Sequence, residues 1–401
     1  MAHLSNSIII DKEKYYFGAA FNLLKPHKLN EVIKLPEGWE LVLNSQSHYL
    51  ILRGNQYKGD MRTFPAYCYE TIQKGLDLLS INGKADISIE SGSEEYCIWW
   101  KNEKQFLRVV RMTDFKMAAS FEMDVIDQDG NRIDTKTEKN TQYHESLRYY
   151  RLSQVTEDLF DSFRNMYLAF ESLLSLRTKI RRGEKEGEWL KRALNNLPYL
   201  RSLENMFEQR KLNVVEKFYK QIYLDVRCNL FHSKNNAKKL IPQNLKDRRK
   251  VSESLQILTQ IVLMLSDELL KIERETAIIT NVGFSKMLDD KFKSEILLSD
   301  SEKKVSIYES FKDDIHQSSF SFNADYSEVL SVSGISYYVG SLNTLNFRGV
   351  PIINRFAFKL DEEIFSVHRI MGLTLEDIDE IEFHLGYRLK NANLPKINFQ
   401  Y

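Results

Sequence analysis

The sequence predicts an α+β protein in which a central antiparallel helical bundle is flanked by N-terminal and C-terminal β-rich segments. In residues 1–140 and 276–401, apolar and polar residues alternate in short runs between turn residues, which is typical of half-buried strands. In residues 141–275, apolar residues recur three and four positions apart, and glycine occurs only at Gly183 and Gly187. That spacing favours amphipathic helices, so we expect three segments with these boundaries.

The first segment is expected to form mainly strands with one helix between them. Thr63 and Pro65 suit the start of that helix, as a cap and a first-turn proline. Strands are expected at 39–43, 48–53, 96–100, 106–112 and 116–126.

The second segment is expected to form a bundle of four or five helices. Within the helix expected at 214–232, Phe218, Ile222, Val226 and Leu230 recur every four residues and mark its buried side. The helices are expected at 144–182, 189–197, 200–210, 214–232 and 244–274.

The third segment returns to strand patterns. Thr374 and Asp377 resemble a capping box, which predicts a short helix at 375–385. Strands are expected at 320–322, 329–332, 335–339 and 352–360.

The composition indicates a soluble globular protein of two or three domains. The chain has 401 residues, of which 43% are apolar and 28% charged. Cys68, Cys97 and Cys228 lie far apart without a CxxC pair, which argues against a disulfide framework or a zinc site. Because we find neither a signal-peptide pattern nor a run of about 18 apolar residues, we expect a cytoplasmic protein without a membrane partner.

The charge is balanced over the chain but not along it. Residues 145–275 contain 25 basic and 18 acidic residues, whereas the rest contains 31 and 38. Within 227–250 there are eight basic residues and one acidic residue, Asp247. Such a local basic field favours an anionic partner such as nucleic acid, and the alternative is a solvated helix face.

The most informative stretch is Arg227-Cys-Asn-Leu-Phe-His232, inside this basic region. A histidine can transfer protons near neutral pH, and an arginine can hold a phosphate with a planar fork of donors. On a regular helix, residues five apart diverge by about 140°. A single copy is therefore a poor site, and a two-fold dimer would join two helix ends into one groove.

Simpler interpretations exist for each of these residues. Arg227 can be a surface arginine paired with Asp225 or another nearby carboxylate. His232 can end its helix by bonding a backbone carbonyl. Glu171, on the first long helix, can be an exposed glutamate paired with Arg164 or Arg177.

The bundle segment resembles the HEPN superfamily, in particular the Apea-like and related bacterial branches. Two elements carry the resemblance: the hexapeptide at 227–232, with its Arg-x4-His spacing, and the upstream Phe163-Arg-Asn-Met-Tyr-Leu-Ala-Phe-Glu-Ser-Leu173. They occur in the expected order, about 60 residues apart. The resemblance covers about 130 of the 401 residues.

This resemblance implies a dimeric, metal-independent endoribonuclease without a cofactor, of a kind found in bacterial antiphage and toxin systems. The RNA 2′-OH would attack its own phosphate, with His232 as general acid and base and Arg227 stabilising the transition state. Asn229 would orient the phosphate or the partner histidine, and Glu171 would be a polar residue facing the active groove. RNA contacts are expected from the basic residues that follow, Lys234, Lys238 and Lys239.

The competing hypothesis is a non-catalytic module that binds RNA or dimerises. In that case the β-rich segments would sense a ligand or a phage protein, and an antitoxin or a phage-derived trigger would be a further partner. A helical bundle does not itself imply an enzyme, so both hypotheses stand at this point.

Overall fold

The computed structural model divides the chain into two compact units. The sheet unit takes its described residues from 1–116 and 279–390, and the helical unit takes them from 117–278. The structure describes residues 1–11, 13–45, 47–92, 94–116, 125–126, 128–130, 132–133, 142–197, 213–231, 239–272, 284, 286, 288, 294–300, 318–322, 325–326, 335–347, 352–360 and 363–390.

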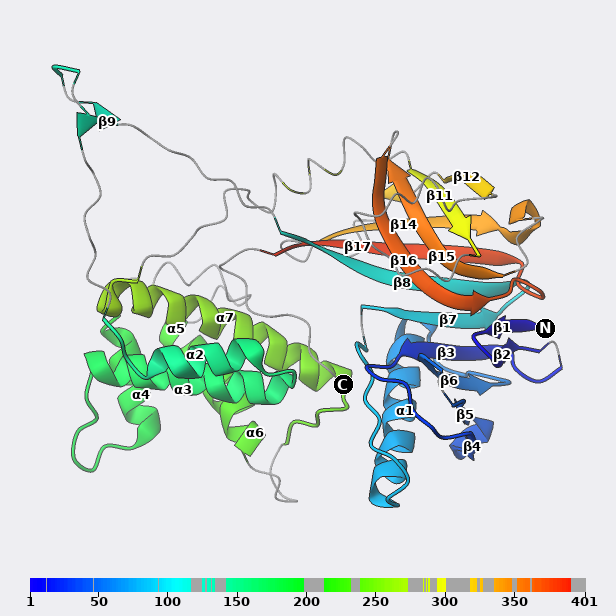
Figure 1. Cartoon of the computed structure of the whole chain (residues 1–401). Coiled ribbons are helices and arrows are strands. Elements are labelled where there is room, and N and C mark those ends of the chain that lie inside the picture. The colour runs from blue at the N-terminus through cyan, green and yellow to red at the C-terminus, as the bar shows by residue number, and fades with distance from the viewer. Residues whose placement is uncertain are drawn as a thin grey trace. The chain divides into compact units, whose positions relative to one another are not determined.

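A nine-stranded mixed sheet dominates the sheet unit (Figure 1). Across the sheet the strands are β13 (Asp325–Tyr326), β14 (Ile335–Asn343), β17 (Glu380–Lys390), β8 (Gln105–Lys116), β7 (Tyr96–Lys101), β3 (Phe17–Asn22), β6 (Tyr49–Gly54), β5 (Glu40–Leu43) and β4 (Glu31–Lys34). Strands β17 and β8 run parallel, in register from the pair Glu380 and Phe106 to the pair Lys390 and Lys116. The other neighbours in this sheet pair antiparallel.

This sheet corrects the predicted fold class. The protein is α+β, but the expectation of a central bundle flanked by separate β-rich segments is wrong, because strands from both ends of the chain share one sheet. The side chains of Arg388 and Asp114 meet across a separation of 274 positions. Alternating patterns identify strands but not their partners, so this pairing could not be predicted from the sequence.

A second sheet and a helix complete the core of the sheet unit. The smaller sheet is antiparallel and contains β12 (Ser318–Phe322), β11 (Ser294–Ser299), β15 (Ile353–Leu360) and β16 (Glu363–Leu373). The helix α1 (Phe64–Ile81) lies beside β3 in Figure 1 and approaches β5 closely, since a Cβ at Gly75 would lie 2.5 Å from Leu41. Strands β1 (Ala2–Leu4) and β2 (Ser7–Ile10) form a separate hairpin.

Two predictions about helices need correction in this unit. Thr63 occupies the N-cap position of α1 as expected, but its side chain makes no capping hydrogen bond. The helix predicted at 375–385 is wrong, because most of that stretch lies in β17. Ile381, Phe383 and Leu385 are all buried, so the period of two outweighs the capping pattern.

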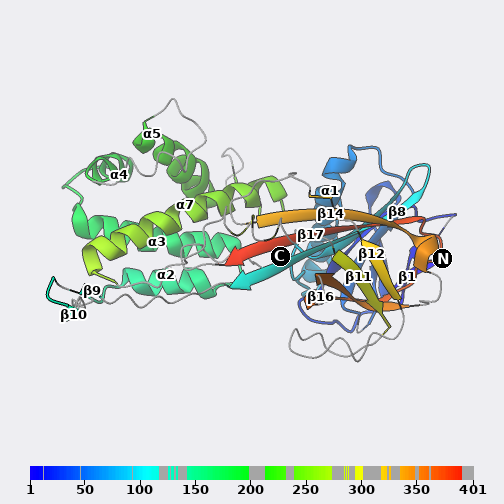
Figure 2. The ribbon, with the colours of Figure 1, turned by 90° about the horizontal axis from the view of Figure 1, so that it is seen from above.

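The helical unit is built from α2 (Ser146–Val155), α3 (Leu159–Arg177), α4 (Glu186–Asn195), α5 (Val214–Phe218), the π-helix η4 (Tyr219–Cys228), α6 (Asn229–Phe231) and α7 (Leu245–Leu270). Helix α3 packs against both α2 and α7, and the three lie side by side in Figure 2. The expected single helix at 144–182 is two helices. Asp158 accepts a hydrogen bond from the Asp161 amide and thereby starts α3.

The predicted apolar stripe of the fourth helix is confirmed. Phe218, Ile222 and Val226 are fully buried, and Leu230 is 7% exposed. Among the described helices, none is long and apolar enough to cross a membrane. Parts of the prediction lie outside the described residues: the helix at 200–210, the strand at 329–332 and most of the strand at 116–126.

Candidate functional site

Arg227 lies where η4 faces α3 and α4. Its Nη2 atom is 2.8 Å from Oε1 of Glu186, in the first turn of α4. The guanidinium carbon lies 5.4 Å from the ring centre of Tyr223 and 5.7 Å from that of Tyr167. These contacts hold the fork of Arg227 in place while a quarter of the side chain stays exposed.

A second carboxylate stands beside this pair. Glu171 lies one helical turn after Tyr167 on the same face of α3. Burial raises the pKa of Glu171, Glu186 raises it further, and the positive charge of Arg227 opposes the rise. Burial also raises the pKa of Tyr223 to about 12, which keeps this phenol protonated at neutral pH. The group thus combines a fixed cation with a carboxyl that can exchange a proton.

This raised pKa predicts a pH dependence of stability. A carboxyl whose pKa is higher in the folded state binds its proton more tightly there, so its contribution to stability is lost as pH rises from its ordinary pKa through the raised one. We expect Glu171→Gln to remove this loss. The unfolding free energy of the variant, compared with that of the wild type, should therefore be higher at neutral pH than at acidic pH. Urea unfolding of both proteins across this range measures the effect.

Glu188→Gln is the matched control, since Glu188 is an exposed glutamate in the first turn of α4. Its unfolding free energy should follow the wild-type pH dependence. An identical pH dependence for wild type and Glu171→Gln would contradict the raised pKa of the half-buried Glu171.

The π-helix η4 carries Tyr219, Tyr223 and Arg227, whose side chains contact one another in a row. In a π-helix, backbone hydrogen bonds connect residues five apart, and such segments are rare and concentrate at functional sites. Tyr219 and Tyr223 stack with ring centres 5.1 Å apart, and Tyr223 in turn contacts Arg227. The angle of about 140° expected between Arg227 and His232 assumed a regular α-helix, which this stretch is not.

The other predicted site residues are only partly placed. His232, Lys234 and Lys238 lie outside the described residues, and Lys239 is exposed. The Asn229 amide donates to the carbonyl of Asp225, 3.1 Å away within its own helix.

The basic character of 227–250 is partly used within the fold. Arg248 is 4% exposed and donates to the Pro242 carbonyl. Lys250 pairs with Asp225, at 3.6 Å. Part of the positive field is therefore not available to an outside anion.

The structure pairs the charged residues differently from the simpler interpretations. Arg227 does form an ion pair, but with Glu186 on another helix. Arg164 pairs with Asp161 and Arg177 with Glu268, whereas Glu171 lies within electrostatic reach of Arg227.

Sequence reasoning missed Glu186, Tyr167 and Tyr223. Tyr223 precedes Arg227 by four positions, a spacing that could have indicated a shared face. Glu186 stands in the charged stretch 181–188, which resembles a solvated loop in sequence. Only the packing of α4 against η4 shows its role.

Comparison with known proteins gives one match. The family model described as methylamine utilization protein MauJ matches residues 146–267, which is less than half of the chain and falls within the helical unit. No curated protein and no solved structure matches the chain.

The match overturns the resemblance to the HEPN superfamily. The family found over this stretch is a different one, and no HEPN family matches it. The resemblance depended on one Arg-x4-His spacing and on an aromatic helix pattern, and buried helices often carry such patterns because packing requires them. What remains is the geometry of the residues themselves.

Proposed function

We propose that the helical unit is a metal-independent endoribonuclease that acts as a dimer. The observation that carries this proposal is the constrained guanidinium of Arg227 beside a carboxyl of raised pKa, Glu171. A perturbed acid next to an arginine is a common arrangement at catalytic sites. The phosphate of an RNA backbone would displace Glu186 from the fork and take its place.

The reaction is an internal transfer. His232 removes the proton of the RNA 2′-OH, the 2′ oxygen attacks the adjacent phosphorus, and the bond to the 5′ oxygen breaks. His232 donates a proton to this leaving oxygen, and Arg227 holds the charge that develops on the phosphate. The products are a 2′,3′-cyclic phosphate and a 5′-hydroxyl, so neither water nor a metal ion is needed.

A second candidate is an RNA-binding module without catalysis. It is favoured by basic side chains that stay exposed after the ion pairs within the fold are made, such as Lys239 and Lys246. Tight RNA binding without products would support this candidate.

The test is to incubate the full chain, in the presence of EDTA, with single-stranded RNA and with an oligonucleotide of the same sequence that lacks every 2′-hydroxyl. We expect cleavage of the RNA alone and products ending in a cyclic phosphate. Cleavage of both substrates, or of neither, would contradict the proposed reaction.

A further inference from the structure

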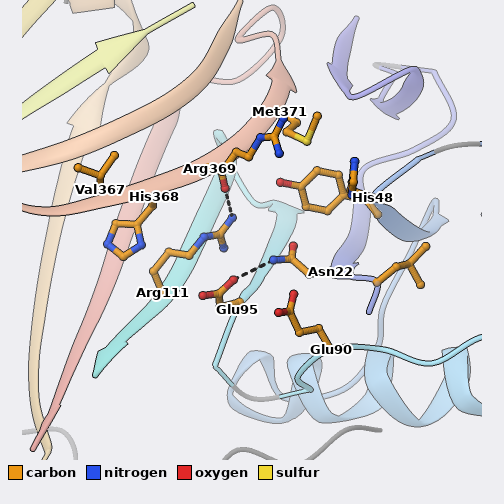
Figure 3. A pocket seen from close by; sticks show the side chains of 11 residues that line it. Asn22, His48, Glu90, Glu95, Arg111, Val367, His368, Arg369 and Met371 are labelled. Atoms are coloured by element: carbon orange, nitrogen blue, oxygen red, sulfur yellow. Dashed lines mark hydrogen bonds between the residues drawn. The ribbon is translucent and has the colours of Figure 1, made fainter. Parts of the chain in front are cut away.

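A cavity of about 300 Å³ lies within the sheet unit, between β8 of the large sheet and β16 of the small one (Figure 3). This volume is at the lower end of the roughly 300–1,000 Å³ that is usual for small-molecule sites. The cavity therefore suits a compact ligand. Its walls carry charges of both signs, and these define the chemistry of that ligand.

The positive wall is Arg111, which is 1% exposed. Its guanidinium donates to the main-chain oxygens of Tyr96, Val110 and Arg369, over 2.7–3.3 Å. Within the described part of the chain, no carboxylate forms an ion pair with Arg111. The charge of Glu95 attracts this cation from beyond ion-pair distance, and a bound carboxylate would give the buried guanidinium a direct partner.

The negative wall is formed by Glu95 and Glu90. Glu95 accepts a hydrogen bond from Nδ2 of Asn22 at 2.9 Å, and this bond holds its carboxylate in place (Figure 3). Partial desolvation raises the pKa of Glu90 although its side chain is largely exposed, Glu95 raises this pKa further, and the charge of Arg111 opposes the rise. Two carboxylates that repel each other would be stabilised by an ammonium group placed between them.

The rest of the lining is partly apolar. Leu23 is 4% exposed, and Val367 and Met371 are half-buried around the same cavity. His368 also lines it, and burial together with Arg111 lowers its pKa to about 3, so the ring is neutral. The apolar groups leave room for a short aliphatic side chain, and the exposed Arg369 adds a second positive charge to the lining.

We infer that this cavity binds a small zwitterion, an α-amino acid with a short aliphatic side chain. The carboxylate faces Arg111, and the ammonium group faces Glu95 and Glu90. This site is independent of the proposed ribonuclease reaction, because all its residues belong to the sheet unit.

The experiment is calorimetric titration of the full chain with alanine and leucine. Each is compared with its two half-molecules: propionate and ethylamine for alanine, isocaproate and isoamylamine for leucine. We expect at least one amino acid to bind, and to bind roughly tenfold or more tightly than either half-molecule, because each end makes a charge-assisted contact. Absence of binding by both amino acids at millimolar concentration would overturn the inference.

Variants separate the two ends of the ligand. Glu95→Gln should weaken amino acid binding about tenfold without weakening binding of the carboxylate half-molecule, because it removes a negative charge that acts on Arg111. Glu90→Gln, at an exposed position, gives the same test without disturbing the core. Glu188→Gln, in the helical unit, is the matched control. Unchanged amino acid affinity in both cavity variants would overturn the assignment of the ammonium end.

Discussion

Replacing Arg227 by alanine should lower the rate of RNA cleavage about 100- to 1,000-fold, the cost of removing one group that stabilises transition-state charge. The guanidinium is held by Glu186 and two tyrosine rings, so its position is set before RNA binds. Arg227→Lys keeps the charge but loses the fork, and it should recover only part of the rate. Initial rates on a labelled RNA strand measure all three proteins.

The matched control is Arg192→Ala, because Arg192 also forms an ion pair, with Glu184, at 2.7 Å. This variant should cleave RNA at the wild-type rate. His232→Ala should lose about 100-fold or more, as expected for a general acid. Thermal unfolding of each variant shows whether the fold is retained. Equal rates for wild type and Arg227→Ala, or an equal loss in Arg192→Ala, would eliminate Arg227 as a catalytic residue.

The sequence predicted local structure well where packing reinforces the pattern. The buried faces of α7 and of the helix through Phe218 and Val226 follow from apolar spacing alone, as do β5, β6 and β7. It failed where long-range pairing decides. Strand β17 was assigned partly to a helix because Thr374 and Asp377 mimic a cap. The alternating burial of its side chains is explained only by its pairing with β8, which lies far away in the sequence.

The candidate site shows the same limit. Arg227 stood out because its chemistry and basic surroundings are visible in the sequence. Glu186 did not, because its contact with Arg227 exists only when α4 packs against η4. The π-helix could not be predicted either. Apolar residues four positions apart fit an α-helix as well as a helix with hydrogen bonds between residues five apart.

Replacing Arg388 by alanine should destabilise the sheet unit by about 3 kcal/mol, because Glu94 and Asp114, whose side chains are 14% and 24% exposed, would lose their cation. Arg388 is 2% exposed, with Nη1 2.5 Å from Oε1 of Glu94 and Nε 2.6 Å from Oδ1 of Asp114. Denaturant unfolding followed by tryptophan fluorescence measures the loss. A Trp189→Phe background restricts the signal to the sheet unit, where Trp39, Trp99 and Trp100 lie.

Arg62→Ala is the control, because Arg62 pairs with Asp60 while its side chain is 89% exposed. An exposed pair of this kind contributes little to stability, because solvent screens it. If Arg388→Ala costs no more than Arg62→Ala, the buried triad is not needed to hold β17 in the sheet.

The triad also bears on how the register of β17 and β8 is specified. Burial raises the pKa of Glu94 even beside Arg388, whereas the two carboxylates raise the pKa of Arg388 despite its burial. The two shifts point in opposite directions, so desolvation and attraction largely cancel and the net stabilisation by the triad is small. Converting all three residues together, Arg388→Met with Glu94→Gln and Asp114→Asn, should therefore restore much of the stability lost in Arg388→Ala.

Arg388 lies directly opposite Asp114, and a slip of one residue would turn it to the other face of the sheet. We thus expect the triple variant to be stable but to exchange the backbone amides of β17 faster than wild type, and unchanged hydrogen exchange would show that apolar packing alone fixes the register.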